Sequence, residues 1–292
     1  MTSMERIDPA ALTPISASGD VRVIVRGAVD AVDSLEPEWI ALAETAAEPN
    51  AYAEHWFVAA SLRALHGGAE VRLLEVRRGE ALIGLLPVTV RQGYAHLPVR
   101  IVQNWVHDQM FLGMPLVASG DEHAFWTAAL EALDGADWAP GLFHICGLTE
   151  HGPVHRGLIA ARAGLTVHRR VRALLESELT PEAYYARAVR SKKRKEIRRL
   201  QNRLAELGPV QARSLDDAGE LDTWCSTYLA LEKAGWKGEA GSSLAAVAET
   251  EAFFREVVTA AWAAGRLQFL RLDVGETCIA MLVNFLTPPG SF

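Results

Sequence analysis

The hydrophobic and polar positions of the chain follow the same pattern twice, 196 positions apart. Residues 71–88 read VRLLEVRRGEALIGLLPV, and residues 267–284 read LQFLRLDVGETCIAMLVN. The two segments align without a gap, so that Gly79 of the first falls on Gly275 of the second. Each is a β-rich run, a Gly-Glu turn and a second β-rich run, which is the pattern of a hairpin. A repeat of such long period predicts a duplicated domain.

Helical patterns precede both hairpins, because apolar residues there recur every three or four positions. After the first hairpin, strand-like and helix-like segments alternate. This order predicts a mixed α/β domain rather than a regular succession of parallel strands and helices. The predicted helices cover residues 35–47, 55–66, 121–133, 153–164, 181–207, 221–229 and 253–261; the further predicted strands cover 21–27, 98–117, 141–148, 166–178 and 210–215.

The repeat divides the chain into two predicted domains, residues 20–179 and 180–292, after a frayed N-terminus at 1–19. Thr180 suits a helix N-cap, and Pro181 suits the first helical position. Only eight residues follow the second copy of the hairpin. We therefore expect the second domain to be incomplete, and its last strand to present an open edge that pairs two copies of the chain as a homodimer.

The composition favours globular domains, since half of the 292 residues are hydrophobic. No apolar run approaches the twenty or so residues needed to span a bilayer. The first residues lack the basic and apolar regions of a signal peptide. The three cysteines are far apart and form no CxxC pair. These features predict a cytoplasmic protein with reduced thiols.

The charge is acidic overall, with a formal net charge of −7, but it is unevenly distributed. Residues 187–203 hold nine Lys or Arg against one Glu. Such a run is either the solvated face of a helix or a site that captures phosphate-bearing anions. The candidate anion-binding residues are Arg190, Lys193, Arg194 and Lys195. One concentrated basic segment in an acidic chain does not predict general nucleic-acid binding.

A glycine-rich loop, EKAGWKGEAGSS, holds Gly235, Gly238 and Gly241 at a spacing of three. It matches neither a Walker loop nor a GxGxxG fingerprint. It is either a plain connection between helices or a substrate loop, with Trp236 as an apolar wall and Lys237 as a charge.

Polar and aromatic residues cluster in NWVHD, where Trp105 and His107 are candidate substrate contacts. His107 stands beside Asp108, which suggests an acid/base pair, but neighbours on a strand point to opposite faces. His151 and His155 have helical metal-pair spacing without the Glu of HExxH, so no metal site is expected. No GxSxG nucleophile motif is present.

Several of these segments together carry a family resemblance. They are the helix around Trp56, GEALIGLLPV, WVHDQMFLGMPLV, SKKRKEIRRLQNRLAELG, the EKAGWKGEAGSS loop, and FFREVV followed by GRLQFLRLDVGETCIAMLVNF. From about residue 20 to the end, the chain resembles GNAT-fold acyltransferases of the CelD or BioF2-like acetyltransferase domain group, relatives of the FemAB peptidyltransferases.

The resemblance implies an α/β (α+β) fold of tandem GNAT-like domains, with mixed sheets flanked by helices. It implies acyl transfer from acetyl-CoA or another acyl-CoA, without a metal, to an amine or hydroxyl of a small-molecule or sugar acceptor in envelope polysaccharide biosynthesis. Matching positions make Glu232, Trp236, Lys237 and Gly238 candidate substrate contacts. No catalytic residue can be assigned.

Members of the group continue beyond the second hairpin, so the resemblance also implies weak or no activity in this chain alone. Two alternatives stay open. The basic segment suits FemAB-type aminoacyl transfer from charged tRNA. An incomplete second domain suits a non-catalytic binding module.

Overall fold

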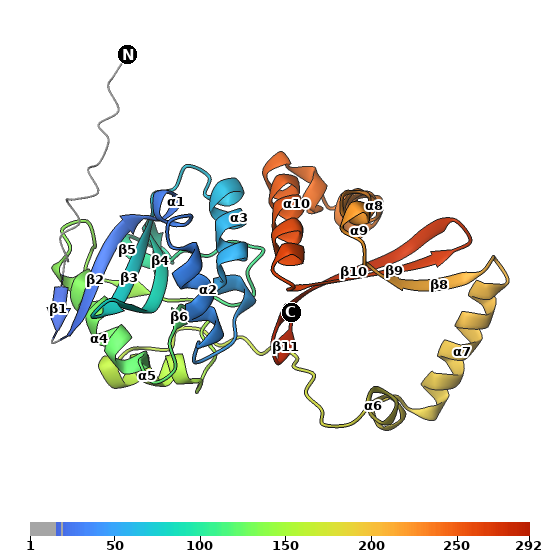
Figure 1. Cartoon of the computed structure of the whole chain (residues 1–292), viewed down its shortest axis with the longest axis horizontal. Helices are drawn as coiled ribbons and strands as arrows, with labels where there is room; N and C mark the ends of the chain where they lie inside the picture. The colour runs from blue at the N-terminus through green and yellow to red at the C-terminus, as the bar shows by residue number, and fades with distance from the viewer. Residues whose placement is uncertain (1–15, 19) are drawn as a thin grey trace, which may run out of the picture.

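The computed structural model describes residues 16–18 and 20–292, and it folds them into a mixed α/β structure (Figure 1). Two sheets, each flanked by helices, follow one another along the chain. This arrangement confirms the predicted fold class. Among the described residues, no helix is long and apolar enough to cross a membrane.

The first sheet has the strand order β1-β2-β3-β4-β5-β7, and β6 pairs with β4. All neighbours are antiparallel except β5 and β7. One face packs on α4 and α5 around Trp126, and the other packs on α1, α2 and α3 around Trp39. The strands are β1 Ser16–Ser18, β2 Val21–Gly27, β3 Val71–Arg78, β4 Ala81–Tyr94, β5 Leu97–Asn104, β6 Leu116–Val117 and β7 Phe143–His144. The helices are α1 Ala28–Ala31, α2 Glu36–Glu44, the short η2 Ala51–Ala53, α3 His55–Leu65, α4 Glu122–Gly135 and α5 Pro153–Ala161.

The second sheet is antiparallel, with the order β11-β10-β9-β8. Helices α8 and α10 cover one of its faces, where Trp224 and Phe269 are buried. The strands are β8 Val210–Ser214, β9 Leu267–Val274, β10 Thr277–Thr287 and β11 Gly290–Ser291. The helices are α6 Pro181–Ala188, α7 Ser191–Ala205, η3 Ala218–Glu220, α8 Leu221–Ala234, α9 Trp236–Glu239, η4 Leu244–Ala246 and α10 Ala248–Ala263.

The repeated sequence pattern corresponds to a repeated hairpin. Gly79 between β3 and β4 has φ +56°, and Gly275 between β9 and β10 has φ +59°. Both values lie in the left-handed region that glycine adopts without a steric penalty. Each hairpin also shifts register at its aligned isoleucine, Ile83 or Ile279, which makes a β-bulge there. The repeat therefore extends from sequence to turn geometry and to the bulge.

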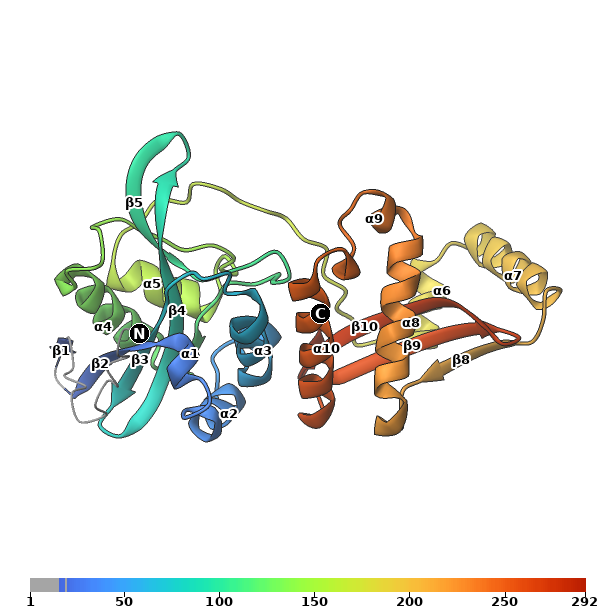
Figure 2. The same ribbon diagram turned by 90° about the horizontal axis from the view of Figure 1, so that it is seen from above.

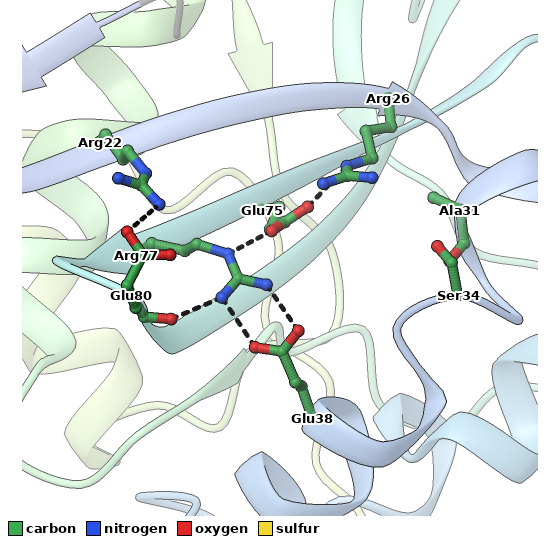
Figure 3. Close-up of polar contacts among 8 residues, drawn as sticks. All are labelled: Arg22, Arg26, Ala31, Ser34, Glu38, Glu75, Arg77 and Glu80. Atoms are coloured by element: carbon green, nitrogen blue, oxygen red, sulfur yellow. Dashed lines mark hydrogen bonds and ion pairs between the residues drawn. The ribbon is translucent and has the colours of Figure 1, made fainter. Parts of the chain in front are cut away.

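Each hairpin carries an ion pair at the same place, with the signs exchanged. In β3, Arg77 donates to the fully buried Glu75 (Figure 3). Arg77 also donates to both oxygens of Glu38 on α2, at 2.7 and 2.9 Å. In β9, the equivalent positions are Arg271 and Asp273, and the Arg271 Nε donates to Asp273 Oδ1 at 2.6 Å. Because a buried charge needs a partner, the contacts of Arg77 with Glu75 and Glu38 tie the first hairpin to α2.

The predicted single helix over 181–207 is wrong, because the chain leaves helical geometry at Val189 and Arg190. Two helices, α6 and α7, result. Arg194 of α7 donates through Nη1 to the carbonyls of Ala186 and Val189, both at 2.6 Å. A side chain thus satisfies carbonyls at the end of α6, which a continuous helix would have paired internally. The predicted N-cap of α6 is confirmed: the Thr180 hydroxyl accepts from the Ala183 N–H at 3.3 Å.

The predicted strand over 166–178 is also wrong, since this segment pairs with no strand of the described residues. It runs outside both sheets between α5 and α6 (Figure 1). Val171 is 97% exposed there. A period-2 pattern produces a strand only where a neighbouring strand can complete its hydrogen bonds, and no strand of the described part of the chain pairs with this segment.

The two parts of the molecule meet where α3 lies beside α10 (Figure 2). Phe57 of α3 and Phe253 of α10 pack edge to face, with ring centroids 5.6 Å apart. Residues of α3 and of the second sheet belong to one apolar cluster. The junction between the two parts is therefore a continuation of the core.

Candidate functional site

The loop after α8 is held in place by one carboxylate. Glu232 lies in the last turn of α8, and its side chain is 8% exposed. Its Oε1 accepts from the Lys237 ammonium at 2.6 Å, and its Oε2 accepts from the Leu244 N–H at 2.7 Å. Two contacts on opposite sides of the glycine-rich loop converge on this group. Glu232 thereby fixes the loop from α9 to η4.

Gly238 is required by close packing within this loop. A Cβ at that position would lie 1.7 Å from the carbonyl oxygen of Lys233, far inside van der Waals contact. The backbone of α9 consequently rests directly on the end of α8. Trp236, at the start of α9, is 72% exposed. A rigid loop thus presents a large aromatic side chain to solvent.

The groups around this loop have defined protonation states. The hydrogen bond to Glu232 raises the pKa of Lys237, which keeps the ammonium charged at neutral pH. Burial raises the pKa of Tyr228, one turn before Glu232 on α8, so its phenol stays protonated. Tyr228 stacks on Phe254 with ring centroids 4.8 Å apart. The loop therefore combines an ammonium, a carboxylate and a phenol beside an exposed indole.

Trp105 and His107 lie together at the end of β5, with ring centroids 5.4 Å apart. Trp105 is buried, and His107 stacks in parallel on Phe57 at 6.0 Å. Burial lowers the pKa of His107 to about 4, so the ring is neutral at physiological pH. Asp108 is exposed and makes no hydrogen bond to His107 among the described residues. The geometry agrees with the expectation that these two neighbours do not form an acid/base pair.

The tautomer of His107 follows from its hydrogen bonding. Its Nδ1 accepts from the Gln109 N–H at 3.3 Å, which assigns the proton of the neutral ring to Nε2. That Nε2 is buried, and within residues 16–18 and 20–292 it has no hydrogen-bond partner. A buried donor of this kind can serve a neutral oxygen of a ligand.

A second buried carboxylate, Glu54, joins the two parts of the molecule and was missed by the sequence analysis. It lies at the start of α3, where its Oε2 accepts from the indole N–H of Trp56 at 2.8 Å. The same oxygen accepts from Arg266 Nε at 3.1 Å, and Oε1 accepts from the Thr287 hydroxyl at 3.2 Å. Arg266 precedes β9 and Thr287 ends β10. No sequence signal links these residues, because their partners are 212 and 233 positions away.

The predicted anion-binding residues all lie at or in α7, at the outer end of the molecule (Figures 1 and 2). Arg190 is the N-cap residue, and Lys193 pairs with Glu196 at 3.1 Å. Arg194 is engaged with the carbonyls at the end of α6. Lys195 is exposed. No residue of α7 is buried.

The structure groups the candidate residues into three places rather than one. The first is the α8–α9 loop with Glu232, Trp236, Lys237 and Gly238; the second is the pair Trp105 and His107; the third is α7. In the described part of the chain, no three His, Cys, Asp or Glu side chains are placed to hold a metal ion. The roles proposed for these residues from the sequence stay predictions.

Residues 191–288, from the start of α7 to just past β10, match the family model of the acetyltransferase (GNAT) domain. The C-terminal part of this chain contains a GNAT domain. The match covers β8, β9 and β10 of the second sheet, the α8–α9 loop and α10, and it supports acyl transfer as the general chemistry. No curated protein matches the sequence. The GNAT part of the expected resemblance is confirmed, whereas the narrower likeness to CelD, BioF2-like or FemAB proteins stays a prediction.

Proposed function

We propose that this chain transfers an acetyl or other acyl group from an acyl-CoA to an amine or hydroxyl of a small acceptor. The match of residues 191–288 to the acetyltransferase (GNAT) domain carries the proposal. GNAT domains generally use acetyl-CoA, and the acceptor attacks the thioester carbonyl directly. The reaction forms an amide or ester and releases the thiol of CoA.

The α8–α9 loop supplies the proposed acceptor contacts. Trp236 offers an exposed aromatic face, which suits the apolar face of a sugar ring. Lys237 offers a charged donor within the same turn of chain. Glu232 and Gly238 act as positioning residues, since one clamps the loop and the other lets α9 rest on α8.

His107 is the proposed contact for a neutral oxygen of the substrate. Its ring is uncharged, its Nε2–H has no partner in the described part of the protein, and Trp105 and Phe57 flank it. A neutral donor in an aromatic setting suits a carbonyl or hydroxyl better than a carboxylate, whose charge would be costly to bury.

An acceptor panel tests the substrate class. The purified chain is incubated with acetyl-CoA and with amino sugars, neutral sugars or simple primary amines, and the released CoA thiol is measured. The proposal expects acceptor-dependent thiol release and an acetylated product by mass spectrometry, in contrast to the weak or absent activity that the family resemblance alone implies for this chain. A sugar acceptor would be consistent with a role in envelope polysaccharide assembly. Thiol release that no acceptor accelerates would contradict the proposal.

A further inference from the structure

Helix α7 is an amphipathic basic helix, and none of its apolar residues belongs to the apolar clusters of the described residues. Its sequence, SKKRKEIRRLQNRLA, holds seven Lys or Arg and one Glu. Ile197, Leu200 and Leu204 recur at a spacing of three and four, so they lie on one side of the helix. Yet none of them is buried: Ile197 and Leu204 are half-buried, and Leu200 is 48% exposed.

The cations are arranged around this apolar stripe. At the helical spacing, Arg194 and Arg198 fall on one side of it, and Lys192 and Arg203 fall on the other. The side chains of Arg198 and Arg203 are exposed and make no ion pair or hydrogen bond within residues 16–18 and 20–292. The charge of the helix is therefore available for an external anionic surface.

Helix α7 stands at the outer end of the molecule, away from the junction between α3 and α10 (Figures 1 and 2). The Arg194 contacts to Ala186 and Val189 fix it relative to α6. An ordered, exposed helix with an apolar stripe bordered by Lys and Arg is the form that lies in the interface of an anionic bilayer.

We propose that α7 docks this protein on a membrane surface that contains anionic lipids. The Lys and Arg side chains contact lipid phosphates, and Ile197, Leu200 and Leu204 enter the boundary between headgroups and acyl chains. Charge complementarity selects an anionic surface. The apolar stripe favours lipid over RNA, because single-stranded RNA is bound through charge together with aromatic stacking, and α7 has no aromatic residue.

Vesicle co-sedimentation of the full chain tests this docking. One set of vesicles is pure phosphatidylcholine, and the other contains phosphatidylcholine with phosphatidylglycerol. We expect binding to the second set, weakened as salt is raised. In the Arg198→Gln, Arg203→Gln double variant, partitioning should fall about fivefold for each charge removed. The Leu200→Gln, Leu204→Gln variant keeps all cations, and its partitioning onto the anionic vesicles should fall about tenfold.

A matched control variant separates the effect of the α7 surface from the effect of the total charge of the protein. Lys233→Gln with Arg100→Gln removes two exposed cations outside α7 and should leave vesicle binding unchanged. Because none of the substituted side chains is buried and Gln is well tolerated in helices such as α7 and α8, circular dichroism should show all variants folded.

Three results would overturn the docking proposal. One is equal binding to both vesicle sets, and another is an equal loss in the control pair. The third is vesicle binding that the leucine substitutions do not change, together with binding to tRNA that weakens as salt is raised. That pair of results would make α7 an RNA contact.

Discussion

Acidification should destabilise the folded protein through His107. The folded structure lowers the pKa of this ring to about 4 because burial disfavours the imidazolium. In the unfolded chain, the ring titrates with the ordinary pKa of about 6.5. Between these two values, the unfolded state binds a proton that the folded state does not. The stabilising contribution is therefore complete above about pH 6.5 and is lost as the pH falls toward 4.

The size of this loss follows from the two pKa values. Linkage gives about 2 kcal/mol of lost stability at pH 5 and about 3 kcal/mol at pH 4 for this one group. The structural cause is the aromatic enclosure by Phe57, Trp105 and Phe253, which offers no acceptor to a second N–H. A protonated ring would have to leave this enclosure or stay unpaired within it.

The assay is urea unfolding, followed by tryptophan fluorescence, of the parent chain and of His107→Phe between pH 7 and pH 4. Other groups titrate in this range, including His55 and His144, whose pKa values are also lowered by burial. The informative quantity is therefore the difference between the two proteins at each pH. The parent should lose about 2 kcal/mol more than His107→Phe on going from pH 7 to pH 5. Parallel pH profiles would refute the assignment of a buried neutral ring.

The remaining predictions concern three other features. Glu54→Gln keeps the shape of the junction but removes its charge, and should lower the free energy of unfolding by about 1–2 kcal/mol; a loss below about 0.5 kcal/mol would show that the junction does not depend on this carboxylate. Gly238→Ala forces a Cβ against a backbone carbonyl of α8 and should cost about 1–3 kcal/mol, whereas Gly164→Ala, with open space around it, should be neutral in the same denaturation assay. Trp236→Ala should raise the KM for the acceptor about tenfold with little change in kcat. The control variant Tyr185→Ala, which removes another exposed aromatic side chain, should leave both constants unchanged. A fall in kcat alone in Trp236→Ala would contradict a binding role for Trp236.

The hairpins could be predicted from the sequence because residues close together in the chain determine them. Alternating apolar positions around Gly79 and Gly275 specify two strands and a turn, and both glycines take the expected left-handed conformation. The N-cap at Thr180 was predictable for the same reason, since its hydrogen bond spans three residues. The break between α6 and α7 was not, because helical periodicity continues through it and a side-chain contact from Arg194 decides the outcome.

In the candidate site, too, the sequence pointed to individual residues but not to the contacts between them. The sequence identified Glu232 and Lys237 as noteworthy, but their mutual hydrogen bond and the clamp on Leu244 appear only in the folded loop. No local sequence pattern pointed to Glu54, because its partners Arg266 and Thr287 lie in the other part of the chain. Contacts of long sequence separation are set by the packing of α3 against α10, and a local pattern does not encode them.

Calorimetric titration of the purified chain with acetyl-CoA tests most directly whether an acyl-CoA is the donor. Thiol release is then followed in the presence of an accepted amine or sugar. Acetyl phosphate, an acetyl donor without the CoA portion, serves as the control donor. The account predicts saturable binding of acetyl-CoA and acceptor-dependent thiol release, with no transfer from acetyl phosphate. Absence of binding at millimolar acetyl-CoA, or equal transfer from both donors, would contradict it.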